Sequence, residues 1–131
     1  MSGVTYQTPY GACQEFTANL AQAAATYDLC TASGDVLIYR AGIYVQTVGA
    51  TFTSVSIQSN GTTAWIILSA LDGALANIAS QRSMPTTWSQ EDPLSLRSGQ
   101  KIQYTLLGAT GTGSLRVQLA YHPITGGAQL T

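Results

Sequence analysis

The residues that could perform acid–base or nucleophilic chemistry are few in this chain. His122 is the only imidazole, and it stands directly before Pro123. A Ser-His-Asp site would need an aspartate beside this histidine, and the sequence offers Asp28, Asp35, Asp72 and Asp92. The Gly-x-Ser-x-Gly turn that exposes a nucleophilic serine does not occur in the sequence. We therefore interpret His122 as an exposed residue at a strand end and predict that the protein is not an enzyme.

Carboxylates and thiols offer no better site for chemistry. Glu91 and Asp92 are adjacent, so in a loop they point in different directions and do not face each other across a cleft as a glycosidase pair does. A structural zinc site would need further ligands beyond Cys13, Cys30 and His122. We expect the two cysteines to be free thiols that pack as small hydrophobic residues in a reducing cytoplasm. The sequence predicts no catalytic residue, no cofactor and no metal.

The whole chain is poor in charge. Of its 131 residues, 8% are charged and 45% are hydrophobic, and the formal net charge is −1. Nucleic acids and anionic membrane surfaces require clustered Lys and Arg, so neither is an expected partner. No apolar run is long enough to span a membrane, and no secretory signal is expected at the N-terminus. Because an uncharged monomer tends to associate, we expect other copies or a partner to cover much of the surface.

Aromatic residues are the best candidates for a contact surface. We select four candidate interface residues, two tyrosines and a phenylalanine near the N-terminus and a tryptophan in a long polar loop: Tyr6, Tyr10, Phe16 and Trp88. Exposed aromatic side chains among neutral polar neighbours suit carbohydrate stacking, and they suit a protein interface equally well. Five other aromatic residues are expected to pack inside the domain: Tyr39, Tyr44, Trp65, Tyr104 and Tyr121.

The N-terminal residues 1–25 differ from the rest of the chain. Phe16 and Leu20 have helical spacing within the Ala-rich segment 14–25, so a short helix is one interpretation. The other is an extended arm that becomes ordered only against a neighbouring subunit. The scarcity of large apolar residues favours the arm.

From residue 26 onward the pattern predicts β-strands. Candidate strands cover 27–30, 35–48 with a bulge or a bend at Ala41-Gly42, and 52–57. A hairpin at Asn60-Gly61 follows, and its returning strand is 62–68. Leu71, Leu75 and Ile78 predict a short helical connection within 70–80. A long polar loop follows over 81–93.

The C-terminal strands are the clearest. Apolar and polar residues alternate over 101–107, a glycine-rich turn covers 108–113, and alternation resumes over 114–121. We therefore predict an all-β fold, an antiparallel β-sandwich or jelly roll with an extended N-terminal arm and one short helical connection. The expected organisation is an arm or helix over 1–25, the sandwich over 26–125 and a loose C-terminal tail over 126–131.

Three stretches of this strand pattern resemble a family of small proteins. The segments Leu94–Ile102, Gly111–Pro123 and Tyr27–Ile38 are similar to small virion proteins of tailed bacteriophages, in a resemblance that covers roughly residues 26–125. The resemblance implies a β-sandwich or jelly roll that serves as a capsid decoration, cement or head-protrusion protein, usually as a homotrimer, with no metal or cofactor. The Tyr-containing, Ala-rich N-terminus departs from this pattern and leaves the mode of anchoring open.

The leading hypothesis is a structural virion protein, assembled in the host cytoplasm, that binds the major capsid protein or another virion protein through sandwich oligomers and its N-terminal arm. The alternative is a tail or fibre-tip receptor-binding protein that recognises glycans. A hydrolase of cell-wall sugar, built on His122 and Glu91, is a third hypothesis.

Overall fold

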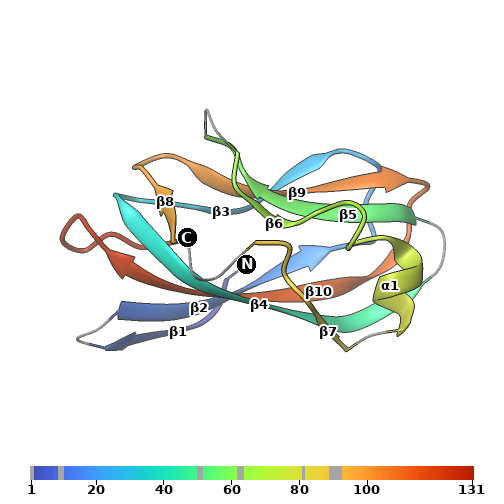
Figure 1. The fold of residues 1–131 in the computed structure, drawn as a ribbon, viewed down its shortest axis with the longest axis horizontal. Coiled ribbons are helices and arrows are strands. Elements are labelled where there is room, and N and C mark those ends of the chain that lie inside the picture. The colour runs from blue at the N-terminus through green and yellow to red at the C-terminus, as the bar shows by residue number, and fades with distance from the viewer. Residues whose placement is uncertain (1, 9–10, 50–51, 62–63, 81, 89–92) are drawn as a thin grey trace.

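The computed structural model describes residues 2–8, 11–49, 52–61, 64–80, 82–88 and 93–131, which form two antiparallel sheets packed face to face (Figure 1). In these residues the larger sheet has six strands, β1 (Ser2–Thr8), β2 (Gly11–Asn19), β10 (Thr112–Pro123), β4 (Val36–Gly49), β7 (Ser83–Met84) and β8 (Leu94–Leu96). The smaller sheet has four, in the order β3 (Thr26–Thr31), β9 (Lys101–Gly108), β5 (Phe52–Ser59) and β6 (Ile66–Leu68). One short helix, α1 (Leu75–Ser80), follows β6.

The strands are connected as a jelly roll. The first half of the chain pairs with the second half in a nested series: β2 with β10, β3 with β9, β4 with β7 and β8, and β5 with β6. The chain passes from one sheet to the other between β2 and β3, β3 and β4, and β4 and β5, and again on its way back. This rolled-up arrangement in two sheets confirms the predicted all-β fold.

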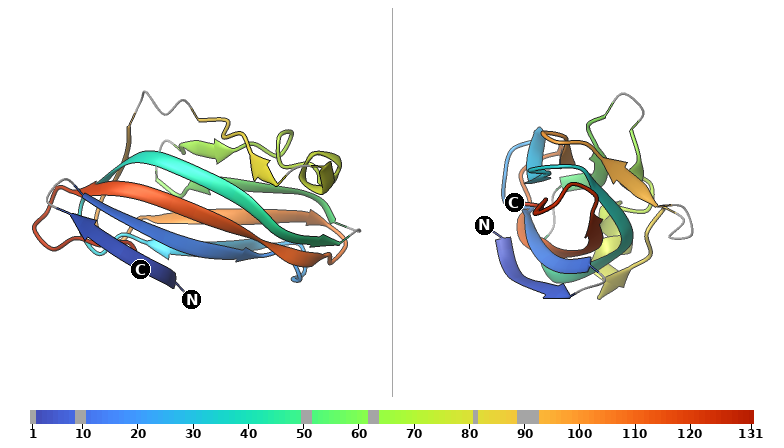
Figure 2. Two further views of the ribbon diagram at one scale, coloured as in Figure 1. Left: turned by 90° about the horizontal axis from the view of Figure 1, so that it is seen from below. Right: turned by 90° about the vertical axis from the view of Figure 1, so that its left-hand side faces the viewer.

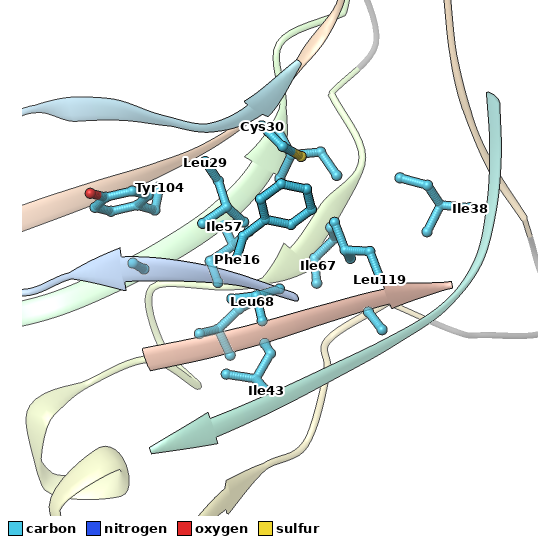
Figure 3. Packing of buried hydrophobic residues seen from close by; sticks show 14 of the residues in the cluster. Phe16, Leu29, Cys30, Ile38, Ile43, Ile57, Ile67, Leu68, Tyr104 and Leu119 are labelled. Carbon is cyan, nitrogen blue, oxygen red and sulfur yellow. The ribbon is translucent and has the colours of Figure 1, made fainter. Parts of the chain in front are cut away.

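The core lies between the sheets, where the inward residues of both interdigitate (Figure 3). The strict alternation predicted over β10 is confirmed, because its inward residues are fully buried: Leu115, Val117, Leu119 and Tyr121. Ile57 and Leu68 face them from the smaller sheet, and Phe16 lies among them (Figure 3). Each buried aliphatic side chain of this kind contributes about 1.5–3 kcal/mol to folding.

The N-terminal segment is extended, but most of it is part of the sandwich. β2 pairs with β10 of the same chain over eight residues, from Ala12 opposite Tyr121 to Asn19 opposite Ser114. The helix interpretation is therefore wrong, and β2 does not need a neighbouring subunit to become ordered. Small residues concealed the strand pattern, because Ala12 and Ala18 occupy inward positions where the rest of the core has large side chains.

Two local predictions need correction, one of a turn and one of a bulge. The β5–β6 hairpin is present, but Gly61 is not among the described glycines with positive φ, so Asn60-Gly61 does not form a type I′ turn. Asn60 instead extends the pairing with β9, since its N–H donates to the Lys101 carbonyl (3.0 Å) and its Oδ1 accepts from the Lys101 N–H (2.8 Å). The bulge expected at Ala41-Gly42 lies at Tyr39, where the register with β10 shifts.

The two segments that flank the strands also differ in detail from expectation. The helical connection is confirmed but starts at Leu75. Before it, Gly73 packs so closely against the Val55 carbonyl that a Cβ there would overlap it. Leu71 stays 81% exposed, outside the helix. The C-terminal residues are not a loose tail: Thr131 exchanges backbone hydrogen bonds of 2.9 Å with Thr31, and Leu130 is buried.

Candidate functional site

The groups that could perform catalysis are apart or engaged elsewhere. His122 is exposed, as predicted, and stacks on Tyr39 with ring centroids 4.5 Å apart. The described aspartates serve local structure: Asp28 accepts from Lys101 (2.7 Å), Asp35 from the Ser98 N–H (3.1 Å) and Asp72 from Thr87 (2.6 Å). Glu91 and Asp92 lie outside the described residues. Among the residues that the structure describes, no three His, Cys, Asp or Glu side chains could hold a metal ion together.

The two thiols differ in their surroundings. Both are free, but Cys13 is half-buried on the outer face of β2, whereas Cys30 is buried on the inner face of β3. Burial raises the pKa of the Cys30 thiol to about 12. Because the thiolate is the nucleophile, Cys30 is unreactive at neutral pH, and Cys13 is the accessible thiol.

The four candidate interface residues do not form one exposed surface. Phe16 and Trp88 are 2% and 6% exposed and belong to the core. Phe16 points inward from β2, and the loop carrying Trp88 lies along β6, where the Thr87 N–H donates to the Ile67 carbonyl (2.8 Å). The two are therefore not exposed contact residues in this chain, contrary to expectation. Tyr6 pairs with Cys13 in the β1–β2 register, and Tyr10 lies outside the described residues.

Three aromatic residues that were expected to pack are exposed instead. Tyr39 and Tyr44 on β4 are 38% and 43% exposed, and Trp65 before β6 is 37% exposed. Tyr104 and Tyr121 are buried, as predicted. Tyr104 donates to the Gln22 side chain (2.8 Å), and burial is the main cause that raises its pKa.

The exposed tyrosines border a groove on the outer face of the larger sheet. The groove has a volume of about 450 Å³ and lies over β4, β10 and β2, the face toward the viewer in Figure 2, left. It is lined by Cys13, Tyr39, Arg40, Ala41, Gly42, Tyr44, Gln118 and Ala120. A volume of this size lies in the range of small-ligand sites, about 300–1,000 Å³.

Small residues on two neighbouring strands make the depression. In the register of β4 with β10, Arg40 lies opposite Ala120, and Gly42 lies opposite Gln118. Gly42 and Ala120 carry almost no side chain, so the face is hollow between the larger groups. Tyr44 leans back along its strand, since a Cβ added at Gly42 would lie 3.5 Å from Tyr44 Cε2.

A β-bulge gives the groove its other wall. At Tyr39 the register with β10 skips one residue of β4, so that both Tyr39 and Arg40 are exposed. In a regular strand these two successive side chains would point to opposite faces, but a bulge bends the strand and redirects one of them. The ring of His122 supports Tyr39 from β10 by stacking.

Hydrogen bonds fix the polar residues beside the groove. Glu15 accepts from Arg116 (3.2 Å) and from Gln118 Nε2 (3.2 Å). On the other side, Gln46 Oε1 accepts from Arg116 Nε (3.3 Å) and from Ser114 Oγ (3.0 Å). The amide of Gln118 is thereby oriented, with its nitrogen toward Glu15 and its oxygen still able to accept a hydrogen bond.

This arrangement supplies binding chemistry: two aromatic rings, a guanidinium and an amide around a floor of small residues. Only the break of the alternating pattern at Ala41-Gly42 signals this site in the sequence. In the described part of the chain no helix is long and apolar enough to cross a membrane. The sequence matches no protein-family model, and the comparisons with curated proteins and with solved structures give no significant match.

Proposed function

We propose that the protein is a structural component of a tailed-phage virion that binds the capsid surface as a decoration, cement or head-protrusion protein. The observation that carries this proposal is the nearly neutral outer face of the smaller sheet, formed by β3, β9 and β5, which we call the neutral face. Its expected partners are the major capsid protein or another virion protein, with three copies of the chain around a symmetry axis.

Uncharged side chains dominate the neutral face. Thr26 and Thr105 hydrogen-bond to each other across β3 and β9 (2.8 Å). The one ion pair among the described residues of this face joins Lys101 and Asp28, and Gln103 also donates to Asp28 (2.9 Å). Two apolar side chains at its margins, Ile66 and Leu107, are 45% and 48% exposed.

A face of this composition suits contact with another protein. The cores of protein interfaces are depleted in Lys, Glu and Asp, because burying an unpaired charge costs several kcal/mol. Hydroxyl and amide groups can exchange water for partner hydrogen bonds at little cost. A subunit that binds only the assembled lattice then stabilises that lattice by mass action. The proposed mechanism is therefore association without chemistry.

The test mixes the purified protein with undecorated capsids. We expect ordered density at symmetric positions by electron microscopy, a trimer mass in solution and a higher temperature of capsid disruption. Gln58→Glu places a charge on the neutral face and should weaken capsid binding at least tenfold, a change of about 1.4 kcal/mol. Thr17→Glu, which places the same charge on the outer face of β2, is the matched control and should bind normally. Wild-type protein that leaves capsids bare would refute the proposal.

A tail or fibre-tip protein that recognises glycans is a second candidate, favoured by the exposed rings of Tyr39 and Tyr44 beside a groove. Trp88 does not support it, because this side chain is buried. This function predicts adsorption to host cells or to their polysaccharide, lost in Tyr44→Ala. Absence of adsorption by the wild type would exclude it.

A further inference from the structure

We propose that the groove on the larger sheet binds a saccharide that carries a carboxylate, a uronic acid or a related sugar acid. The inference names the ligand class for the second candidate function and does not depend on the capsid proposal. It rests on three independent properties of the groove: its aromatic walls, its hydrogen-bonding groups and its charge.

The aromatic walls suit a sugar ring. Tyr39 and Tyr44 keep 38% and 43% of their surfaces exposed, although most large apolar side chains of the chain are buried. The Tyr44 ring packs against Gly42, and both tyrosines line the groove together with Ala120, so a flat ligand can lie against aromatic carbon. The C–H-rich face of a pyranose has this shape, and it removes apolar ring surface from water on binding.

The hydrogen-bonding groups of the groove suit sugar hydroxyls. Gln118 lines the groove from β10 with its Nε2 committed to Glu15, so its amide oxygen is an oriented acceptor. Arg40 adds several N–H donors, and Tyr39 and Tyr44 add phenol hydroxyls. Hydroxyl-bearing ligands need donors and acceptors in this mixture, since each buried hydroxyl without a partner costs binding energy.

Charge selects a sugar with a carboxylate over a neutral one. Arg116 is neutralised by Glu15 (3.2 Å), and Lys101 on the opposite sheet is neutralised by Asp28 (2.7 Å). Arg40 lies at the groove with no carboxylate within ion-pair distance among the described residues. A guanidinium binds a carboxylate with two parallel hydrogen bonds, and such charge-assisted bonds are about twice as strong as neutral ones. The groove therefore favours an anion on a protein whose formal net charge is −1.

The structure contains its own reporter for this site. Cys13 lines the groove and is accessible, whereas Cys30 is buried with a pKa raised to about 12. A thiol reagent such as dithionitrobenzoate should therefore label only Cys13 in the folded protein. Cys13→Ser, which should react only after denaturation, checks that assignment.

The experiment measures the rate of Cys13 labelling with trigalacturonate and with the neutral galactose trisaccharide as probes. We expect millimolar trigalacturonate to slow labelling several-fold and the neutral trisaccharide to slow it much less. Arg40→Gln should weaken protection by trigalacturonate about tenfold, as expected for loss of a charge-assisted pair. Arg97→Gln, an exposed arginine away from the groove, should change nothing. Tyr44→Ala should weaken protection by both sugars, and Trp65→Ala by neither.

Several outcomes would overturn the proposal. Equal protection by the two trisaccharides removes the role of the carboxylate, and no protection by trigalacturonate removes the site. Equal protection by a glutamate-containing tripeptide shows that the groove binds carboxylates without selecting a sugar, which contradicts the proposed ligand class. Because soluble sugars and purified protein suffice, failure here is separable from failure of the wild type to adsorb to cells or to bind capsids. Thermal unfolding of each variant confirms that the exposed substitutions leave the fold intact.

Discussion

The two outer faces of the sandwich are made by strands of the same jelly roll, yet they differ in the side chains that they expose. The neutral face of β3, β9 and β5 carries one exposed ion pair among its described residues. The face of β2, β10 and β4 holds a groove, two exposed tyrosines and the Glu15–Arg116 pair. In the pairing of β4 with β10 the register shifts at Tyr39 and again at Gln46, and Gly42 lies between the two shifts. The smaller sheet has register shifts of its own, between β3 and β9 and between β5 and β9. The groove therefore depends on the residues that β4 carries around its first bulge, Tyr39, Arg40 and Gly42.

The largest expected difference between the two sheets is the stability that each loses when one of its glycines is replaced by alanine. Gly108 at the end of β9 has a φ of 90°, and a Cβ there would meet the Thr53 backbone nitrogen at 2.7 Å. We expect Gly108→Ala to lower the free energy of unfolding by about 2–4 kcal/mol, from left-handed strain plus steric overlap. Gly42→Ala meets only the Tyr44 ring, at 3.5 Å or more, and should change stability by less than about 1 kcal/mol. Urea unfolding of both variants measures the contrast, and equal losses would contradict it.

The next largest difference is between the contributions of the two ion pairs to stability. The more buried pair should contribute more. The Glu15 side chain is 23% exposed and accepts from two partners, whereas Asp28 is 49% exposed. Glu15→Ala should cost about 1–2 kcal/mol, because it removes the charged partner of Arg116 and the acceptor of the Gln118 amide nitrogen. Asp28→Ala should cost less than about 1 kcal/mol, as surface pairs do. A larger loss in Asp28→Ala, measured by the same urea unfolding, would reverse the ranking of the two faces.

The smallest expected effect is a pH dependence of stability that comes from the neutral face. Hydrogen bonds from Gln103 and from Lys101 hold the pKa of the Asp28 carboxyl below its ordinary value. A carboxyl with a lowered folded pKa adds stability above its unfolded pKa, near 4, and that stability disappears as the pH falls through the folded pKa. We expect Asp28→Asn to remove this acid dependence. The change in the free energy of unfolding should be less than about 1 kcal/mol, because the group is exposed. Urea midpoints between neutral pH and about pH 2 at low salt measure it, and an unchanged wild-type slope in Asp28→Asn would contradict it.

The all-β class followed from the sequence because the C-terminal strands alternate strictly. β10 has large inward residues at every second position, so hydrophobic burial and residue pattern agree. β2 escaped recognition because Ala12 and Ala18 supply little apolar surface, and their burial depends on β10, about 100 residues away. Long-range pairing of this kind leaves no local signal.

The groove was harder to predict than the fold. An exposed Tyr39 depends on the bulge, and the bulge depends on the register with β10, which no single strand reveals. Trp88 shows the reverse error, since it was expected to be exposed and is buried. The polar composition of its loop predicted exposure. A backbone hydrogen bond from the Thr87 N–H to the Ile67 carbonyl instead holds the loop along β6, and the indole lies in the core.

The position of β10 has a consequence for biosynthesis. This strand lies between β2 and β4, yet it is the last strand of the described chain, so the centre of the larger sheet is empty until residues 112–123 have left the ribosome. Before that moment β2 and β4 have open edges that can pair with other nascent chains. Folding must then wait for contacts between distant residues, and such topologies fold in milliseconds to seconds. A ribosome that stalls before residue 112 would therefore hold an aggregation-prone chain, and a chaperone that covers those edges would raise the yield of folded protein.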